Sequence, residues 1–502
     1  MISTSAVLSG FMTALSPYNL LLLFGGTVLG IIFGALPGVS STMGCAVLIP
    51  LTYGMDPASG LILLSGIYCG STYGGSISAC LLNTPGTPAS AATTLEGFPM
   101  TRQGRGGEAL QEACIASLWG GIIGALALFF LAPTIAQLSL KFGSQENAML
   151  AVFGLTIIVS LSDGSLLKGF VSGILGVLLS MVGLDVATAY PRYTFKLTAL
   201  YGGIAIIPAI VGLYSLTQLL TSSGEKESVL LDEKSIDELK VPKLGIGDFF
   251  RRWVIYLKCS VLGTFIGIVP GAGGNIAGYM AYNHVKNSSK TPEQFGKGCR
   301  DGVAATESAN NAVCGGSLIP MLTLGIPGNS VAAVLMGGLM IQGLNPGHSL
   351  FTNYAHVTYP FLAGFVLAQI AFTVVGLLGA KHFAKVVKAP KGFLLAGIGV
   401  LCVVGSYAAS NNIADVYVML TFGIIGYFLK CAGFDMSAIV LGLMLGSLAE
   451  AGFVQSYNLC KRDVAATLMS FITRPISLTL LVISVLSVIS PLLRARKKNK
   501  QA

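Results

Sequence analysis

The sequence contains few charged residues. Asp, Glu, Lys and Arg make up only 10% of its 502 residues, whereas soluble domains contain roughly 25%. The first 95 residues include a single charged side chain, Asp56, and neither Lys nor Arg. A soluble chain of this length needs far more polar surface. Such a stretch is stable only where lipid or other helices surround it.

Several chemical signatures are missing as well. The ten cysteines include no C-x-x-C pair, so they indicate apolar packing and not a disulfide or zinc framework. No G-x-x-x-x-G-K-[ST] loop occurs, which argues against a pump that is driven by ATP, and any driving energy must come from an ion gradient or a partner. The first apolar segment follows no basic stretch, and we therefore expect no cleavable signal peptide. We expect no enzymatic activity and no cofactor.

Apolar segments dominate what is present. Hydrophobic residues make up 53% of the chain, and the mean hydropathy is +0.76. We expect an all-α, multi-pass membrane protein, with about 12–15 membrane segments in the lipid bilayer. Spans are expected near 17–36, 58–82, 109–131, 147–161, 166–183, 198–220, 253–270, 303–325, 359–380, 392–409, 415–431, 436–453 and 476–493, with half-helices near 42–53, 274–285 and 330–343.

The charged residues divide the chain into parts. The formal net charge is +9, and the basic residues gather in loops and at the C-terminal end. In so apolar a chain this pattern indicates positive-inside anchoring and not nucleic-acid binding. The sequence predicts a first membrane half at 1–221, a polar linker at 222–252, a second half at 253–493 and a basic cytoplasmic tail at 494–502.

The two halves resemble each other. The pattern V-L-G-x-x-x-G-x-x-P-G at 28–38 recurs at 261–271, 233 residues later. A second Pro-Gly pair, Pro85-Gly86, recurs as Pro327-Gly328, 242 residues later. Coincidence in a Gly-rich chain is the alternative, but two ordered pairs favour an internal repeat.

Loop charges predict how the repeats are oriented. Arg102 and Arg105 follow the second Pro-Gly pair of the first half, whereas the matching loop 344–358 has neither Lys nor Arg. After the first Pro-Gly pair the pattern reverses, because the basic residues lie at 286–300 of the second half. Positive loops stay cytoplasmic. The halves are therefore predicted to be inverted repeats, with the N-terminus periplasmic and the C-terminus cytoplasmic.

Each Pro-Gly pair predicts a broken or re-entrant helix. A break frees backbone groups that must face protein, water or ligand, and a helix that starts after it directs its N–H groups at that site. Simple kinks with capped ends are the alternative. The predicted substrate-binding residues at the four breaks are Ser40, Ser41, Asn83, Thr84, Gly86, Thr87, Gly271, Gly273, Gly274, Asn275, Gly328, Asn329 and Ser330.

Glu307 is an ionisable residue inside a predicted span. If the segment is helical, Asn310 and Asn311 share its face. Intramembrane carboxylates mark ion or substrate pathways, so these three residues are predicted to bind the coupling cation, Na⁺ or H⁺. A structural Glu that caps a helix is the alternative.

Several segments together resemble the large membrane subunit of the tripartite tricarboxylate transporters, the TctA family. They are 34–38 (GALPG), 70–76 (GSTYGGS), 83–86 (NTPG), 95–99 (LEGFP), 269–273 (VPGAG), 307–312 (ESANNA) and 325–328 (GIPG), within a similarity that spans about residues 15–450. Glu96 stands where the family pattern leads us to expect Asp. The resemblance implies a multi-pass permease of the bacterial inner membrane, with a small four-helix membrane subunit and a periplasmic solute-binding protein as partners. It also implies cation-driven uptake of a tricarboxylate such as citrate, or of a related carboxylate.

Two other functions are consistent with parts of the sequence. A passive anion channel would also use Gly-rich breaks. Residues 245–248 (GIGD) match the G-x-G-D of intramembrane aspartyl proteases, but such an enzyme needs two opposed carboxylates within the membrane. Asp248 lies in the charged linker and has no such partner in the sequence.

Overall fold

The computed structural model describes residues 4–37, 39–161, 166–185, 187–224, 239, 241–271, 273–386 and 391–499. The chain forms two compact units. Unit 1 comprises Met1–Ile135 and Gln218–Ala409, and unit 2 comprises Ala136–Thr217 and Ser410–Ala502. Each unit therefore combines a segment from before the polar linker with a segment from after it. The two compact units do not coincide with the two predicted halves. Most of the linker, 225–238 and 240, lies outside the described residues, as do Gly38 and 500–502.

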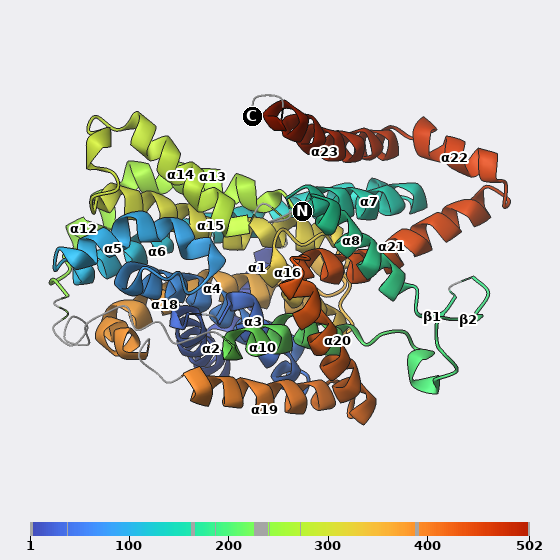
Figure 1. The fold of residues 1–502 in the computed structure, drawn as a ribbon, viewed down its shortest axis with the longest axis horizontal. Coiled ribbons are helices and arrows are strands. Elements are labelled where there is room, and N and C mark those ends of the chain that lie inside the picture. Colours follow the sequence, from blue (N-terminus) through green and yellow to red (C-terminus); the bar gives the residue numbers. More distant parts are fainter. Residues whose placement is uncertain are drawn as a thin grey trace. The chain divides into compact units, whose positions relative to one another are not determined.

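The secondary structure in the described part of unit 1 consists of helices joined by loops (Figure 1). Its helices are α1 (Thr4–Ala14), α2 (Pro17–Ala35), α3 (Ser41–Leu48), α4 (Pro57–Leu82), α5 (Thr94–Arg102), most of α6 (Gly106–Leu138), α10 (Thr217–Ser223), α12 (Ile246–Phe250), α13 (Trp253–Ile268), α14 (Gly273–Ser288), α15 (Arg300–Leu324), α16 (Ser330–Ile341), α17 (His348–Thr352), α18 (Ala355–Val386) and α19 (Lys391–Ser410), with 3₁₀ turns η1 (Ile49–Thr52), η2 (Pro88–Thr93) and η6 (Pro292–Gln294).

Unit 2 is also mainly helical. It contains η3 (Ser139–Lys141), α7 (Ser144–Leu161), α8 (Leu166–Ser180), η4 (Thr198–Leu200), α9 (Ile206–Ile210), the π-helical turn η5 (Val211–Leu216), α20 (Ile413–Cys431), α21 (Met436–Leu459), α22 (Val464–Thr473) and α23 (Pro475–Asn499). Two short antiparallel strands, β1 (Gly183–Leu184) and β2 (Pro191–Arg192), follow α8. The predicted span 198–220 begins later than expected, at Ile206, because the 3₁₀ turn η4 and an irregular segment occupy residues 198–205. Helix α23 continues into the basic tail as far as Asn499.

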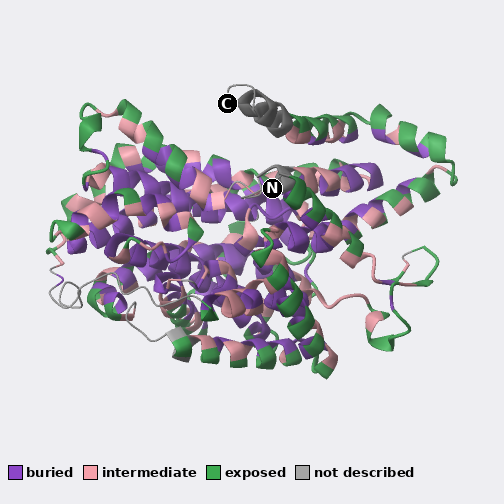
Figure 2. Cartoon of the chain, viewed as in Figure 1, coloured by how far each residue is buried: buried purple, intermediate pink, exposed green. Residues whose placement is uncertain are grey.

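The membrane class follows from these helices. Among the described residues, six helices are long and apolar enough to cross a membrane, and the bent pair Val464–Thr473 and Pro475–Ile489 raises the number to seven. The all-α multi-pass prediction is confirmed. Helices α4 and α15 are not among the six, although both were predicted as spans. Both contain many small polar residues and are buried along almost their whole length (Figure 2). Because other helices and not lipid surround them, they do not need a fully apolar surface.

Local sequence sets the limits of these two buried helices. Asp56 caps α4, since its carboxylate accepts hydrogen bonds from Ala58 N and Ser59 N. The helix ends where Asn83 adopts a left-handed conformation, with φ of 57°. Helix α15 ends in the same way at Gly325, with φ of 71°. Asn83 and Gly325 are 242 residues apart, the offset of the second Pro-Gly pair.

Helix packing in unit 1 repeats with the sequence offsets. A Cβ atom at Gly74 of α4 would lie 2.5 Å from the carbonyl oxygen of Ile31 in α2, and one at Gly316 of α15 would lie 2.5 Å from that of Thr264 in α13. The α4 and α15 positions differ by 242 residues, and the α2 and α13 positions differ by 233. Small residues thus allow the same close helix contact twice.

The helix directions are those that an inverted repeat requires. Gly26 and Gly34 of α2 face Leu63 and Ser71 of α4, so these two helices run parallel. Helices α4 and α15 run antiparallel, because Tyr68 contacts Ser317 and Thr72 contacts Cys314. The chain after α2 must therefore turn back through α3 before α4 begins. The same holds for α13, α14 and α15.

The loops gather at two ends of unit 1. At one end, Gln103 donates a hydrogen bond to the carbonyl oxygen of Lys297 at 2.7 Å, which joins the two loops rich in Lys and Arg. At the other end, Gln342 donates to the carbonyl oxygen of Thr52 at 2.9 Å. This second pairing joins the segments that lack basic residues.

Candidate substrate and cation site

The breaks of the first half are stabilised by local caps. Ser40 Oγ accepts a hydrogen bond from Met43 N at 3.1 Å, and Ser41 is buried in the first turn of α3. Thr84 donates to its own turn, at Leu82 O. Thr87 and Ser90 bond each other at the start of η2. These hydroxyl groups stabilise the helix ends, as the kink interpretation expects.

Gly86 lies where two helices approach closely. Its N–H donates to Gly75 O of α4 at 3.3 Å. A Cβ atom at Gly86 would collide with the carbonyl oxygen of Gly34 in α2. This position therefore requires Gly because of contact with protein backbone. Asn83, with its left-handed backbone, begins the same break.

The two breaks of the second half meet directly. Gly271 N donates to Gly328 O at 2.9 Å, and Gly328 N donates to Ser317 O of α15 at 3.1 Å. The second of these bonds matches the Gly86–Gly75 bond, with both residues shifted by 242 positions. Gly273, with φ of 60°, starts α14.

The start of α14 faces η2, the 3₁₀ turn that follows the Pro85-Gly86 break of the first half. A Cβ atom at Gly274 would lie 2.5 Å from Asn310 Oδ1 and 2.8 Å from Ala89 Cβ. Asn275, the next residue, has a buried Oδ1 atom with no hydrogen-bonding partner in the described part of the chain. Segments from both halves therefore meet at this point.

The start of α16 is tied to helix α4. Asn329 Oδ1 caps α16 by accepting a hydrogen bond from Ala332 N, and its Nδ2 donates to Tyr68 OH at 2.8 Å. Tyr68 OH also lies 3.1 Å from Ser317 Oγ. Ser330 is the first residue of α16. The sequence analysis missed Tyr68 and Ser317, which have no motif of their own.

Glu307 is completely buried in α15. Its Oε1 accepts a hydrogen bond from Thr93 of η2, and its Oε2 accepts one from Ser117 of α6 at 3.1 Å. Asn311 Nδ2 lies 3.4 Å from the same Oε2 atom and donates to Ser117 Oγ at 2.8 Å. Among the described residues no Lys or Arg forms an ion pair with Glu307. Sequence reasoning missed Thr93 and Ser117, because three-dimensional folding alone brings them to Glu307.

Residues close to Glu307 in the sequence of α15 carry buried polar atoms without partners. The side-chain oxygens of Ser308, Asn310 and Asn311 have no hydrogen-bonding partner within the described ranges, and neither does Asn310 Nδ2. The Asn310 side chain lies beside Gly274 and interacts with Glu307. Buried polar groups are normally satisfied, so a group of exceptions requires an explanation such as an ion, water or ligand. Carboxylate and neutral oxygens are the ligands that hard cations prefer.

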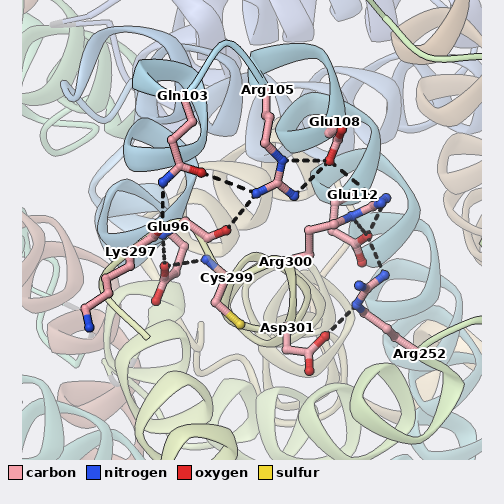
Figure 3. A network of polar contacts seen from close by, with 11 residues as sticks. Glu96, Gln103, Arg105, Glu108, Glu112, Arg252, Lys297, Cys299, Arg300 and Asp301 are labelled. Atoms are coloured by element: carbon pink, nitrogen blue, oxygen red, sulfur yellow. Dashed lines mark hydrogen bonds and ion pairs between the residues drawn. The ribbon is translucent and has the colours of Figure 1, made fainter. Parts of the chain in front are cut away.

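Glu112 shows how the same unit neutralises a different buried carboxylate. Its Oε2 lies 3.0 Å from Arg252 and 3.1 Å from Arg300 (Figure 3). Its Oε1 accepts a hydrogen bond from Tyr256 OH at 2.7 Å. An acidic residue in an apolar helix is a signal that could have identified Glu112. Its two arginine partners indicate a structural role, in contrast to Glu307.

The protease interpretation has no geometric basis. Asp248 Oδ2 accepts a hydrogen bond from Gly245 N at 2.9 Å and so caps the short helix α12. Nearby, Trp119 Nε1 donates to Phe249 O at 2.8 Å, which fixes the end of the linker on α6. A catalytic pair needs a second carboxylate that shares a proton, and in the described ranges no ion pair or hydrogen bond joins Asp248 to another acid.

Known proteins resemble this chain over most of its length. Residues 20–441 match the family described as the Tripartite tricarboxylate transporter TctA family. An uncharacterized 52.8 kDa protein in the TAR-I ttuC' 3'region of Agrobacterium vitis is 35% identical over 491 residues, which cover 98% of this chain and 96% of that protein. An uncharacterized protein in the TAR-II ttuC' 3'region of the same organism is 33% identical over 240 residues, or 48% of this chain and 98% of that protein. The chain belongs to the tripartite tricarboxylate transporter TctA family and is a multi-pass membrane subunit of such a transporter.

Proposed function

We propose that this subunit couples the entry of a cation, Na⁺ or H⁺, to the import of a carboxylate across the bacterial inner membrane. A tricarboxylate such as citrate, or a related organic acid, is the proposed substrate. A periplasmic binding protein delivers it, and a small four-helix membrane subunit completes the transporter. The carboxylate binds at the breaks, and the cation binds at Glu307 with Asn310 and Asn311.

The environment of Glu307 is the main support for the cation site. A lone carboxylate within a bilayer costs roughly 2.5 kcal/mol or more on insertion scales. Three hydrogen-bond donors reduce that cost but leave the charge without a counter-ion. A bound cation or proton removes the charge, and the unpartnered oxygens of Asn310 and Asn311 supply further ligands.

The ends of the short helices support a carboxylate site. Helix α14 starts beside Asn310, and α16 starts at the break that contains Gly328. Helix N-termini attract anions through their unsatisfied N–H groups and dipoles. In broken-helix carriers these ends hold the substrate, while oxygens nearby hold the coupling ion.

Uptake by the reconstituted three-component transporter tests the proposal. Glu307→Gln keeps the shape of the side chain and removes its charge. We expect this variant to insert normally and to lose cation-dependent uptake. Glu108→Gln is the matched control, because Glu108 is one-third exposed and pairs with Arg105 at the surface. Full cation dependence in Glu307→Gln would show that Glu307 is structural.

Counterflow separates a carrier from a passive channel. A carrier preloaded with unlabelled substrate accumulates labelled substrate transiently, because binding sites exchange one molecule for another. We expect such an overshoot. Simple equilibration without overshoot would favour the channel.

A further inference from the structure

Glu96 binds a loop from the opposite half of the chain. It lies in α5 and is completely buried. Its Oε2 accepts hydrogen bonds from Gly298 N at 2.8 Å and from Cys299 N at 2.7 Å. Its Oε1 accepts from Gly296 N and, at 2.8 Å, from Tyr282 OH. Four donors therefore satisfy both carboxylate oxygens, and no basic side chain in the described ranges pairs with them.

The loop at 289–299 is shaped around this carboxylate. Gly296 and Gly298 have φ values of 85° and 89°, a region that side chains disfavour. This backbone directs the N–H groups of Gly296, Gly298 and Cys299 at the carboxylate, as in an anion-binding nest. Gly302, in the first turn of α15, leaves the space that the Glu96 side chain occupies, since a Cβ atom there would lie 2.5 Å from Glu96 Cγ.

These contacts join the two basic loops at one end of unit 1. Gln103 donates to Lys297 O at 2.7 Å, and Arg105 reaches Gly298 O at 3.4 Å (Figure 3). The opposite end has no equivalent of Glu96. The residue 242 positions later is Gly338, which faces apolar atoms of Ile49 and Leu64. Among the described residues of these two ends, a buried carboxylate fastens the basic end and not the other.

The segment that carries Glu96, formed by η2 and α5, also reaches the candidate cation site. Thr93, three residues before Glu96, donates to Glu307, and α5 begins at the next residue. A displacement of Thr93 therefore moves the helix that carries Glu96. Glu307 and the 289–299 loop are in turn connected through the first two turns of α15.

We propose that Glu96 is a positioning residue that latches the basic end of unit 1 shut, and that its release from residues 296–299 opens the exit for the transported anion. The inference rests on the proposed transport function. A chain that is latched at its cytoplasmic end accepts substrate from the periplasm first, as delivery by a binding protein requires. Helix α5 then moves away from the loop when the substrate leaves.

Cys299 is a natural reporter of the latch. Its N–H donates to Glu96, and its side chain is only partly exposed. The full chain with its partner subunits is reconstituted and treated with N-ethylmaleimide, and the alkylation of each cysteine is followed by mass spectrometry. Cys431 is exposed and lies in unit 2, so its rate is the internal control.

Two variants release the latch to different extents. In Glu96→Gln an amide nitrogen replaces one oxygen, so two of the four donors lose their acceptor. We expect Cys299 to react about tenfold faster or more, with the rate of Cys431 unchanged. Tyr282→Phe removes one donor and leaves the carboxylate, so we expect a smaller increase. If Glu96→Gln fails to insert, Tyr282→Phe provides the same comparison.

Turnover distinguishes a latch from a fixed clamp. In the wild-type transporter, citrate with its binding protein and a cation gradient should raise the Cys299 rate several-fold. The latch would be overturned if the rate of Cys299 alkylation were unchanged in both variants. It would also be overturned if the wild-type rate did not change during turnover. Cation-independent uptake would instead contradict the proposed function, while the effects of the variants on Cys299 without substrate would still test the latch.

Discussion

Tyr68 and Asn310 occupy matching positions in α4 and α15, 242 residues apart, but their surroundings differ. Tyr68 OH bonds with Ser317 and Asn329, so its polar atom is satisfied. Neither polar atom of the Asn310 side chain has a partner in the described part of the chain. The residue that matches Ser317 is Gly75, which has no side chain to offer. The polar atom at the Tyr68 site is therefore satisfied, whereas the polar atoms at the Asn310 site remain available to a ligand.

The contact between Thr72 and Cys314 shows how the sites are related. Their side chains lie 3.4 Å apart, and the two positions are themselves separated by 242 residues. A contact between two matching residues is expected on the pseudo-two-fold axis of a repeat. The two sites therefore share one scaffold, and the difference in side chains decides which of them can hold a ligand.

Larger side chains at Gly86 and Gly328 should have the largest effect on transport. We expect Gly86→Val and Gly328→Val to abolish uptake, because a Cβ atom at Gly328 would lie 2.6 Å from Ser317 Cα and one at Gly86 would meet the Gly34 carbonyl. Gly25→Val is the control, since its Cβ atom would have no neighbour within 4 Å. Uptake of labelled citrate and the amount of inserted protein are measured together. Normal uptake by both variants would show that these breaks tolerate side chains.

The two members of the matched pair should respond differently. We expect Asn310→Ala to raise the cation concentration for half-maximal uptake about tenfold, or roughly 1.4 kcal/mol, because it removes a candidate ligand oxygen. Tyr68→Phe should leave that concentration unchanged and destabilise the protein by about 1–3 kcal/mol, because Ser317 and Asn329 lose a partner. Uptake titrations and thermal unfolding in detergent give both values. If Tyr68→Phe instead raised the cation concentration and Asn310→Ala did not, the ligand-binding site of the pair would lie in the first half.

The pH dependence of Cys299 alkylation should show the smallest effect. Burial raises the pKa of the Cys299 thiol above its ordinary value. Because the thiolate is the reactive form, the wild-type rate at neutral pH is low and rises as the pH approaches that raised pKa. In Glu96→Gln the loop is exposed, so the pKa falls and the profile shifts to lower pH. Identical profiles would show that the loop stays closed without the carboxylate.

Much of unit 1 was predictable from the sequence. The Pro-Gly pairs predicted breaks at 36–40, 83–87, 269–273 and 325–329, and helices end or begin at each of them. Periodicity predicted the short helices after the breaks, since α3, α14 and α16 lie close to the expected half-helices. Helix α5 was missed because the segment 94–102 contains Pro99 and charged residues and is too polar for a membrane signal.

The candidate site was predicted less completely. Glu307 could be identified because an acid in an apolar segment is rare. Its partners Thr93 and Ser117 are ordinary hydroxyl residues, and neither lies within helical reach of it in the sequence. Ser40, Thr84 and Thr87 were predicted to face substrate, yet they bond their own turns. Their roles in binding stay a prediction.

The sequence by itself determined the membrane class, the family, the breaks and the repeat offsets, because scarce charge, Pro-Gly pairs and Gly spacing are local properties of the chain. Only the tertiary structure decided which polar atoms are satisfied. Glu96, Glu112 and Glu307 are all buried acids, but one binds backbone N–H groups and a tyrosine, one pairs with two arginines and one has no counter-ion among the described residues. Those differences arise from partners that are far away in sequence, and only the packing of the two halves brings them into contact.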